Sequence, residues 1–272
     1  VSLLSPDDSK DPYYAFHGWA GIEGLEENDT PNSSTIWTLK SGRVLTENSP
    51  ITLSWKNDKG IIFEKTISID ENYMFEISQS VINGSSKNIK LYPYGNLTRN
   101  GQPDTIGFYI LHEGVVGMHD GELIETNYGD IPDLSREEVT REIQQNGWIG
   151  FTDKYWMSTL IPRAGQTFKM DQRYYSSSDN FEVWMRLPPI TVNKNERASV
   201  KTNLFVGAKE VNTIKFYQNS LDIENFVDSV DWGWFFYLTK PIFFLLDWFN
   251  GYTHNMGSVS YTHLTLPTNR EV

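Results

Sequence analysis

The architecture of this chain is set by two neighbouring segments, Ile51-Thr52-Leu53-Ser54-Trp55 and Ile61-Ile62-Phe63-Glu64-Lys65-Thr66-Ile67-Ser68-Ile69. Apolar and polar residues alternate through much of both segments, as expected when one face of an extended strand is buried. Between them, Asn57-Asp58-Lys59-Gly60 has the composition of a turn. The pair therefore predicts a β-hairpin with a short, glycine-containing loop.

Similar strand signals continue on both sides of this hairpin. They cover residues 36–39, 73–81, 89–94, 148–152, 168–175, 181–187 and 198–206. Short strands that recur about every 8–12 residues are typical of antiparallel sandwiches. The sequence thus predicts a mainly β protein, whereas Tyr13 to Ile22, with its aromatic residues and glycines, is interpreted as a short irregular stretch.

Helix signals are few. Ser135 and Glu138 form a capping-box pattern, which predicts a short surface helix of about 10 residues ending near Asn146-Gly147. Residues 210–220 have a mixed composition that also allows a helix. Neither segment changes the prediction that strands dominate the fold.

Charge and composition limit the function. The 272 residues carry a formal net charge of -12 and include no cysteine. An acidic chain of this kind does not favour a nucleic-acid partner, and without cysteine it forms neither disulfides nor thiolate metal sites. No signal peptide is visible after Val1, so the chain is interpreted as an internal fragment of a longer protein.

An aromatic segment follows from Phe226 to Asn255. We expect a helix from about Lys240 to Tyr252, with Thr239 as its N-cap and Pro241 in its first turn. The apolar run is shorter than the ~20 residues that span a bilayer. Three interpretations are open on pattern alone. They are a buried helix that caps the sandwich, which the pattern favours, a helix in the membrane interface, and a helix in the groove of a partner.

Signals of catalysis are weak. His112-Glu113 and His119-Asp120 are the only neighbouring histidine–carboxylate pairs, and both are expected in exposed loops. The pairs Glu26-Glu27 and Glu137-Glu138 are expected to be solvated, and no nucleophile, phosphate-loop or zinc motif is present. We therefore predict a protein that is not an enzyme, with no catalytic residues, no metal site and no cofactor.

Two motifs are more specific than the composition. The first is Gly147-Trp148-Ile149-Gly150-Phe151-Thr152-Asp153-Lys154-Tyr155-Trp156-Met157-Ser158-Thr159-Leu160-Ile161-Pro162. The second is Val230-Asp231-Trp232-Gly233-Trp234-Phe235, which continues through Lys240-Pro241 to Trp248. Both resemble motifs of bacterial YidC-family membrane protein insertases. Weaker matches lie at 63–73 and 204–207, so that the resemblance covers roughly residues 10–257.

The resemblance implies an antiparallel β-supersandwich related to galactose mutarotase, with a short surface helix and a C-terminal amphipathic helix at the membrane interface. It divides the chain into a periplasmic domain (1–225), a linker with the interfacial helix (226–257) and a tail interpreted as non-native (258–272). Asp247 and Asn250 are expected to face away from the bilayer. The residues expected to contact the interface are Trp234, Pro241, Phe243, Phe244, Leu246, Trp248 and Phe249.

For function, the resemblance implies the periplasmic domain of an inner-membrane insertase and chaperone. Its partners would be nascent membrane proteins, components of the Sec translocon and the lipid surface, with the insertion machinery in a transmembrane part that follows Gly257. The alternative is a carbohydrate-binding or aldose-epimerase-like supersandwich protein. That alternative requires a histidine and a carboxylate that converge in an aromatic pocket. A surface adhesion domain is a third interpretation without a specific feature in its favour.

Overall fold

The structure, a computed structural model, describes residues 4–103, 112–232 and 236–253. The chain divides into two compact units. The first ends at Ser229, and the second includes everything from Val230 onwards. We describe each unit by itself.

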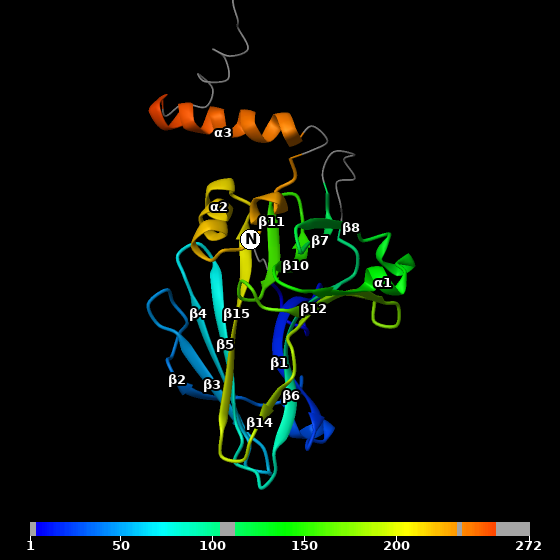
Figure 1. The fold of residues 1–272 in the computed structure, drawn as a ribbon, viewed down its shortest axis with the longest axis vertical. Coiled ribbons are helices and arrows are strands. Elements are labelled where there is room, and N and C mark those ends of the chain that lie inside the picture. Colours follow the sequence, from blue (N-terminus) through cyan, green and yellow to red (C-terminus); the bar gives the residue numbers. More distant parts are fainter. Residues whose placement is uncertain (1–3, 104–111, 233–235, 254–272) are drawn as a thin grey trace, which may run out of the picture. The chain divides into compact units, whose positions relative to one another are not determined.

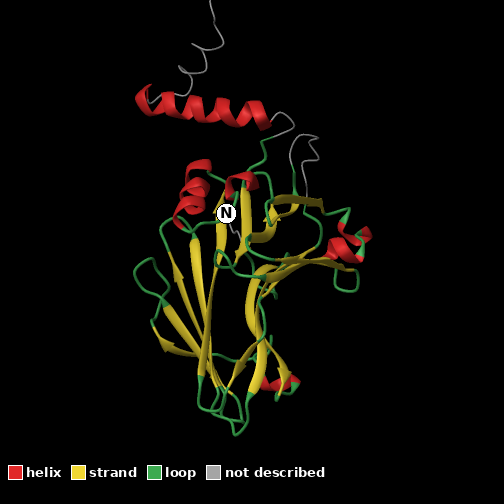
Figure 2. Ribbon diagram, viewed as in Figure 1, coloured by secondary structure: helices red, strands yellow, loops and turns green. Residues whose placement is uncertain are grey.

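The first unit contains two antiparallel sheets, and the long strands β4, β5, β15 and β6 lie roughly upright in the view of Figure 1 (Figures 1 and 2). The six-stranded sheet has the order β1-β6-β13-β12-β9, with β14 also paired to β6. The bounds of its strands are β1 Tyr13–Glu23, β6 Ile89–Asn100, β9 Thr140–Ile143, β12 Phe168–Tyr175, β13 Asn180–Arg186 and β14 Ile190–Val192. All of its pairings are antiparallel.

The nine-stranded sheet has the order β2-β3-β4-β5-β15-β11-β10-β7-β8. Its strands are β2 Thr38–Ser41, β3 Ile51–Lys56, β4 Ile62–Ile69, β5 Met74–Ile82, β7 Gly114–His119, β8 Glu122–Asn127, β10 Gly147–Thr152, β11 Trp156–Ile161 and β15 Arg197–Ala208. The predicted fold class, a mainly antiparallel β-sandwich, is confirmed.

The predicted hairpin is formed by β3 and β4, with Ile51 opposite Ile67. Asn57 fixes the turn because its Oδ1 accepts the backbone N–H groups of Lys59 at 3.0 Å and Ile61 at 2.9 Å. Gly60 completes the turn at φ 84°, a left-handed conformation that glycine adopts without steric cost. The local sequence therefore determines the register of this hairpin.

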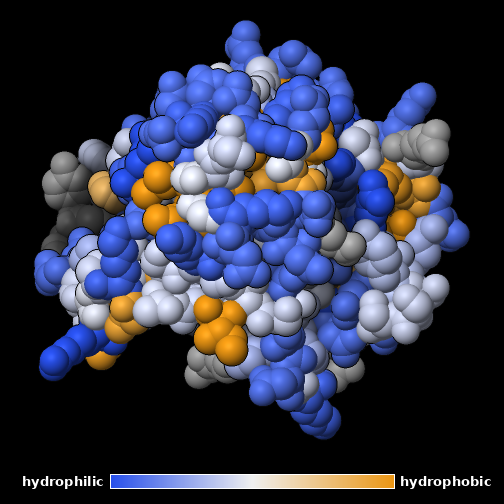
Figure 3. Space-filling view, turned by 90° about the horizontal axis from the view of Figure 1, so that it is seen from below, coloured by the Kyte–Doolittle hydropathy of each residue, from blue (hydrophilic) through white to orange (hydrophobic). Residues whose placement is uncertain are grey.

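Apolar side chains of alternate residues fill the space between the sheets in two clusters. Leu97, Val183 and Leu160 are fully buried in the larger cluster, and Phe63 and Leu91 are fully buried in the smaller one. Figure 3 views the molecule from below, and the surface there is mainly hydrophilic with separate hydrophobic patches. More of the large apolar side chains of the described residues are buried than exposed, as the hydrophobic effect favours.

Polar residues lie between parts of the two clusters, although Val200 packs against both. On β1, His17 lies between Ala15 of the larger cluster and Trp19 of the smaller one. Lys65 occupies the same level on β4, and Gln79 on β5 donates from Nε2 to the carbonyl of Gly18 at 2.8 Å. The sequence pattern did not reveal this layer of polar residues.

Two local predictions were wrong. The stretch from Tyr13 to Ile22 is not irregular but belongs to strand β1, paired with β6 along its length. Packing explains the glycine at position 18, because a Cβ atom there would lie 2.8 Å from the hydroxyl oxygen of Tyr94. A glycine inside a strand can thus mark a close approach rather than a break.

The helix expected after Ser135 is also much shorter than predicted. α1 is limited to Arg136–Val139. The capping box itself is present, since the Ser135 N–H donates to Glu138 Oε2 at 2.9 Å. The helix ends because residues 140–143 form β9 and pair with β12, where Thr140 lies opposite Asp171. Tertiary pairing has overridden a local helix signal.

One end of the sandwich is covered by α2 (Val211–Ser220), as expected for residues 210–220, and by the 3-10 turn η3 (Phe226–Ser229). Tyr217 of α2 donates its hydroxyl to Asp70 at 2.7 Å. Phe226 packs edge-on against Trp148 at 5.3 Å between ring centroids. The first unit therefore extends to Ser229, beyond the expected boundary at residue 225. Two further 3-10 turns are η1 (Glu27–Asp29) and η2 (Ile131–Asp133).

Candidate functional site

The second unit contains α3, which runs from Phe236 to Thr253. It begins earlier than the predicted start at Lys240, so Thr239 is not its N-cap. Thr239 instead donates its hydroxyl to the backbone carbonyl of Trp232 at 2.7 Å. Pro241 consequently lies inside the helix rather than in its first turn. The helix was predicted correctly, but its N-terminal boundary was not.

One face of α3 exposes large apolar side chains. Leu238, Ile242, Leu245 and Trp248 are 53%, 44%, 48% and 57% exposed. Their spacing of three and four residues places them on the same side of a helix. Pro241 is exposed as well. Within the described residues, no helix is long and apolar enough to cross a membrane.

The remaining predicted interface residues form a partly buried aromatic group. Phe243, Phe244, Leu246 and Phe249 are each half-buried. The Trp232 ring lies 5.4 Å from Phe243 and 5.8 Å from Phe244, measured between centroids. Trp232 thus joins the site although the sequence analysis did not assign it there; its place in the second motif was the available signal.

Three further residues named in the prediction lie outside what the structure describes. Trp234 belongs to a segment outside the described residues. The side chains of Asp247 and Asn250, expected to face away from the bilayer, are likewise outside the described part. Those expectations remain predictions.

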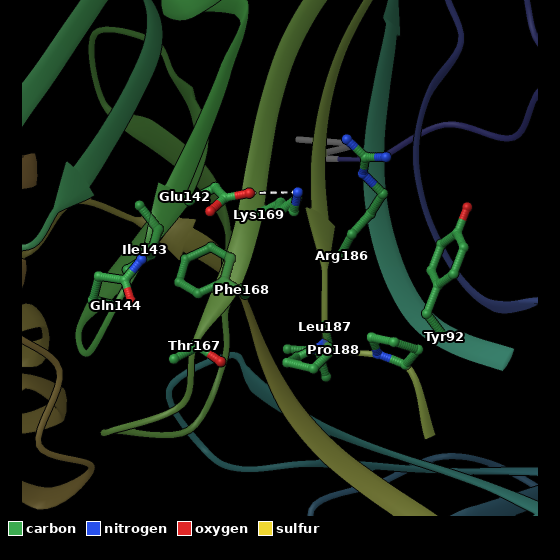
Figure 4. Close-up of a pocket in the computed structure, with 11 residues that line it drawn as sticks. Tyr92, Glu142, Ile143, Gln144, Thr167, Phe168, Lys169, Arg186, Leu187 and Pro188 are labelled. Carbon is green, nitrogen blue, oxygen red and sulfur yellow. Dashed lines mark ion pairs between the residues drawn. The ribbon is translucent and has the colours of Figure 1, made fainter. Parts of the chain in front are cut away.

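A separate pocket of about 420 Å³ lies on the first unit, between β9, β12 and the end of β13 (Figure 4). Lys169 and Glu142 form an ion pair of 2.5 Å on one side of it. Arg186, across the pocket, is paired with Asp171. The pocket's other lining residues are Tyr92, Ile143, Gln144, Thr167, Phe168, Leu187, Pro188 and Pro189. Each charged side chain of the pocket takes part in an ion pair, and most of the other lining residues are apolar.

The histidines do not form a catalytic arrangement among the described residues. His112 makes a 2.8 Å hydrogen bond between Nε2 and the Val115 carbonyl oxygen, and His119 lies 3.9 Å from Glu122. His17 is buried, and burial lowers its pKa to about 3, so its imidazole is neutral near pH 7. The described part of the chain also contains no group of three or more metal-binding side chains.

The fold and the helix define the class of protein: a β-sandwich domain followed by an aromatic, amphipathic helix. Residues 1–245 match the family model of the YidC periplasmic domain, and this chain belongs to that family. The family assignment made from the two sequence motifs is therefore confirmed.

Relatives support the same assignment. Membrane protein insertase YidC of Dinoroseobacter shibae is 47% identical over 98% of this chain and 45% of its own length. The protein of the same name from Jannaschia sp. is 47% identical over 94% of this chain and 45% of its own length. The chain thus spans about 45% of the length of these relatives.

Solved structures show a more distant similarity. A galactose mutarotase related enzyme from Lactobacillus acidophilus is 9% identical, with 63% of this chain and 71% of that chain covered, at a TM-score of 0.45. A galactose mutarotase-like protein from Lactobacillus casei is 10% identical, with coverages of 71% and 84%, at a TM-score of 0.43. At these TM-scores the similarities carry no argument about activity.

Proposed function

We propose that this chain is the periplasmic part of a membrane protein insertase and chaperone of the bacterial inner membrane. Such a protein assists the insertion and folding of integral membrane proteins, alone or together with the Sec translocon. Membership of the YidC periplasmic domain family and the printed names of the relatives support this proposal. The domain would act through binding rather than covalent chemistry.

Within this function, α3 lies flat in the membrane interface with its exposed face towards the acyl chains. The exposed row of Leu238, Ile242, Leu245 and Trp248 carries this part of the proposal. Burial of side chains that are already half exposed in water contributes about 1 kcal/mol each, so the row supplies several kcal/mol. Aromatic residues such as Trp248 favour the headgroup boundary.

Flotation of the chain with phospholipid vesicles tests this orientation. We expect the intact chain to float, and a Leu238→Ser/Leu245→Ser/Trp248→Ser variant to remain at the bottom of the gradient. Ile36→Ser/Val44→Ser is the matched control, because these residues are 88% and 68% exposed but lie on the first unit. Equal flotation of the α3 variant and the intact chain would refute the interfacial helix.

The role in insertion is tested with the full-length protein in cells depleted of the endogenous insertase. Photo-cross-linkers placed on the first unit should capture nascent membrane proteins or Sec components if these are the partners. Adducts that contain neither would contradict this part of the proposal. The carbohydrate alternative gains no support, because none of the described histidines converges with a carboxylate in an aromatic pocket.

A further inference from the structure

The outer face of the six-stranded sheet carries a row of aromatic rings across three adjacent strands. Phe16 of β1 stacks on Tyr94 of β6, with centroids 6.1 Å apart and ring planes 27° apart. Tyr94 is followed by Trp184 of β13 at 5.3 Å. These residues alternate with core residues such as Leu97 and Val183, so strand periodicity directs them away from the interior. We call Phe16, Tyr94 and Trp184 the aromatic row.

A groove of about 630 Å³ lies against the aromatic row. On β1 the groove is lined by the small residues Ala20 and Gly21 as well as by Phe16. One wall is formed by residues 25–33. Asp29 anchors this wall, since Lys59 Nζ donates to its carboxylate at 2.6 Å and Asn57 Nδ2 donates to its carbonyl at 2.9 Å.

Polar groups lie at the side of the groove opposite that wall. Glu182 accepts the indole N–H of Trp184 at 2.8 Å, and burial raises the pKa of its carboxyl group. Asn96 is only 5% exposed and donates from Nδ2 to Thr98 Oγ1 at 2.9 Å. Its Oδ1 makes no hydrogen bond to any described residue, so it can accept one from an occupant of the groove.

The charged residues around the groove favour a positively charged ligand. Its lining includes two carboxylates and neither lysine nor arginine, although the Lys65 ammonium lies 5.0 Å from the centroid of the Phe16 ring. Glu26 is 3.3 Å from Lys59, so its charge is partly balanced. Glu182 lies opposite Arg173 in the register of β13 and β12, but Arg173 also pairs with Asp171 at 3.4 Å. A cation at Glu182 would gain from the carboxylate and from the faces of the aromatic rings together.

We propose that this groove binds an extended polypeptide segment whose Arg or Lys side chain lies between the aromatic row and Glu182. Apolar neighbours in the segment cover the remaining rings, and the Asn96 oxygen accepts a backbone N–H. The groove crosses three strands, which suits an extended chain better than a compact ion. The inference concerns the first unit alone and depends neither on α3 nor on insertion activity.

A saccharide is the competing ligand, because sugars also stack on aromatic rings. The two differ in their dependence on charge. A neutral sugar could donate hydroxyl groups to the second oxygen of Glu182, but only a guanidinium or ammonium group also gains from the charge of the carboxylate. Salt weakens the peptide interaction through screening but leaves sugar binding nearly unchanged.

The test is a titration of the whole chain with two fluorescent ten-residue peptides, Leu- and Pro-rich, that differ only by Arg or Gln at the centre. We expect at least tenfold tighter binding of the Arg peptide. Glu182→Gln should remove this preference, and Ala20→Trp, which fills the groove without touching the core, should abolish binding of both peptides. Glu125→Gln on β8 is the control and should change nothing.

Thermal unfolding of each variant shows whether it is folded. Equal affinities for the two peptides, or no binding of either at millimolar concentration, would overturn the proposal. So would binding of maltohexaose that Ala20→Trp abolishes and salt does not weaken, since the groove would then be a saccharide site. Because α3 is unchanged throughout, a failure here is distinguishable from failure of the interfacial helix.

Discussion

The ammonium of the half-buried Lys65 lies 5.0 Å from the ring centroid of Trp37. The Phe16 ring is at the same distance on another side. Lys65 forms no ion pair with any described residue. The faces of these two rings are therefore the main groups that stabilise the Lys65 charge. Burial lowers the pKa of its amino group to about 8.

The Lys65→Met variant should be more stable than the wild type at pH 7, by roughly 1–3 kcal/mol. Methionine keeps the length of the side chain and removes the desolvated charge. The difference should shrink between pH 8 and 10.5, because the folded wild type releases its proton in this range before the unfolded chain does. Urea unfolding at pH 7, 9 and 10.5 measures the difference in unfolding free energy between the variant and the wild type. A difference that stays constant with pH would show that charge is not the cause.

Burial of His17 should lower the free energy of unfolding in acid. Its pKa falls from 6.5 to about 3 on folding, chiefly through burial, with a smaller contribution from Lys65. Above pH 6.5 the imidazole is neutral in both states and costs nothing. Between pH 6.5 and 3 only the unfolded chain takes up the proton, so the free energy of unfolding decreases by about 1.4 kcal/mol per pH unit.

The His17→Leu variant isolates this effect, because leucine does not titrate. Carboxylates such as Asp29 and Asp120, whose pKa values are lowered by hydrogen bonds, also destabilise the fold in acid but are present in both proteins. The stability of wild type minus variant should therefore fall steadily from pH 6.5 to 4. Parallel pH profiles for the two proteins would contradict the assignment to His17.

The aromatic groove and the buried polar layer show where sequence analysis reached its limit. Alternation predicted strands such as 168–175 with their bounds intact, since one face of each is buried. It did not predict the aromatic row, because Phe16 lies in a stretch interpreted as irregular and because which strands lie side by side is a non-local property. β1 lies 66 or more residues from its partner β6 in sequence, and its glycines concealed it. For α3, sequence predicted the apolar face but not that Trp232 would pack on it.

At position 150, within the first family motif, only glycine fits without a steric clash. An added Cβ atom there would lie 1.9 Å from the carbonyl oxygen of Ser158 on the paired strand β11. Gly150→Ala should therefore force β10 and β11 apart and cost more than 2 kcal/mol of unfolding free energy. Gly129→Ala is the matched control, because no atom lies within 4 Å of its added Cβ. Thermal unfolding compares the two; similar melting temperatures would refute the close approach.

The ion pair between Arg99 and Asp153 links the two sheets, and we expect the two residues to be energetically coupled. Arg99 Nη1 donates to Asp153 Oδ1 at 2.7 Å and to the Tyr128 hydroxyl at 3.0 Å, and its side chain is only 16% exposed. Asp153→Asn leaves the guanidinium without its counter-charge and should cost about 2–3 kcal/mol. Arg99→Gln should cost a similar amount. The double variant should cost less than the sum of the two single changes, because no unpaired charge remains. A double-mutant cycle by urea unfolding measures this coupling, and strictly additive costs would mean that the pair contributes nothing beyond packing.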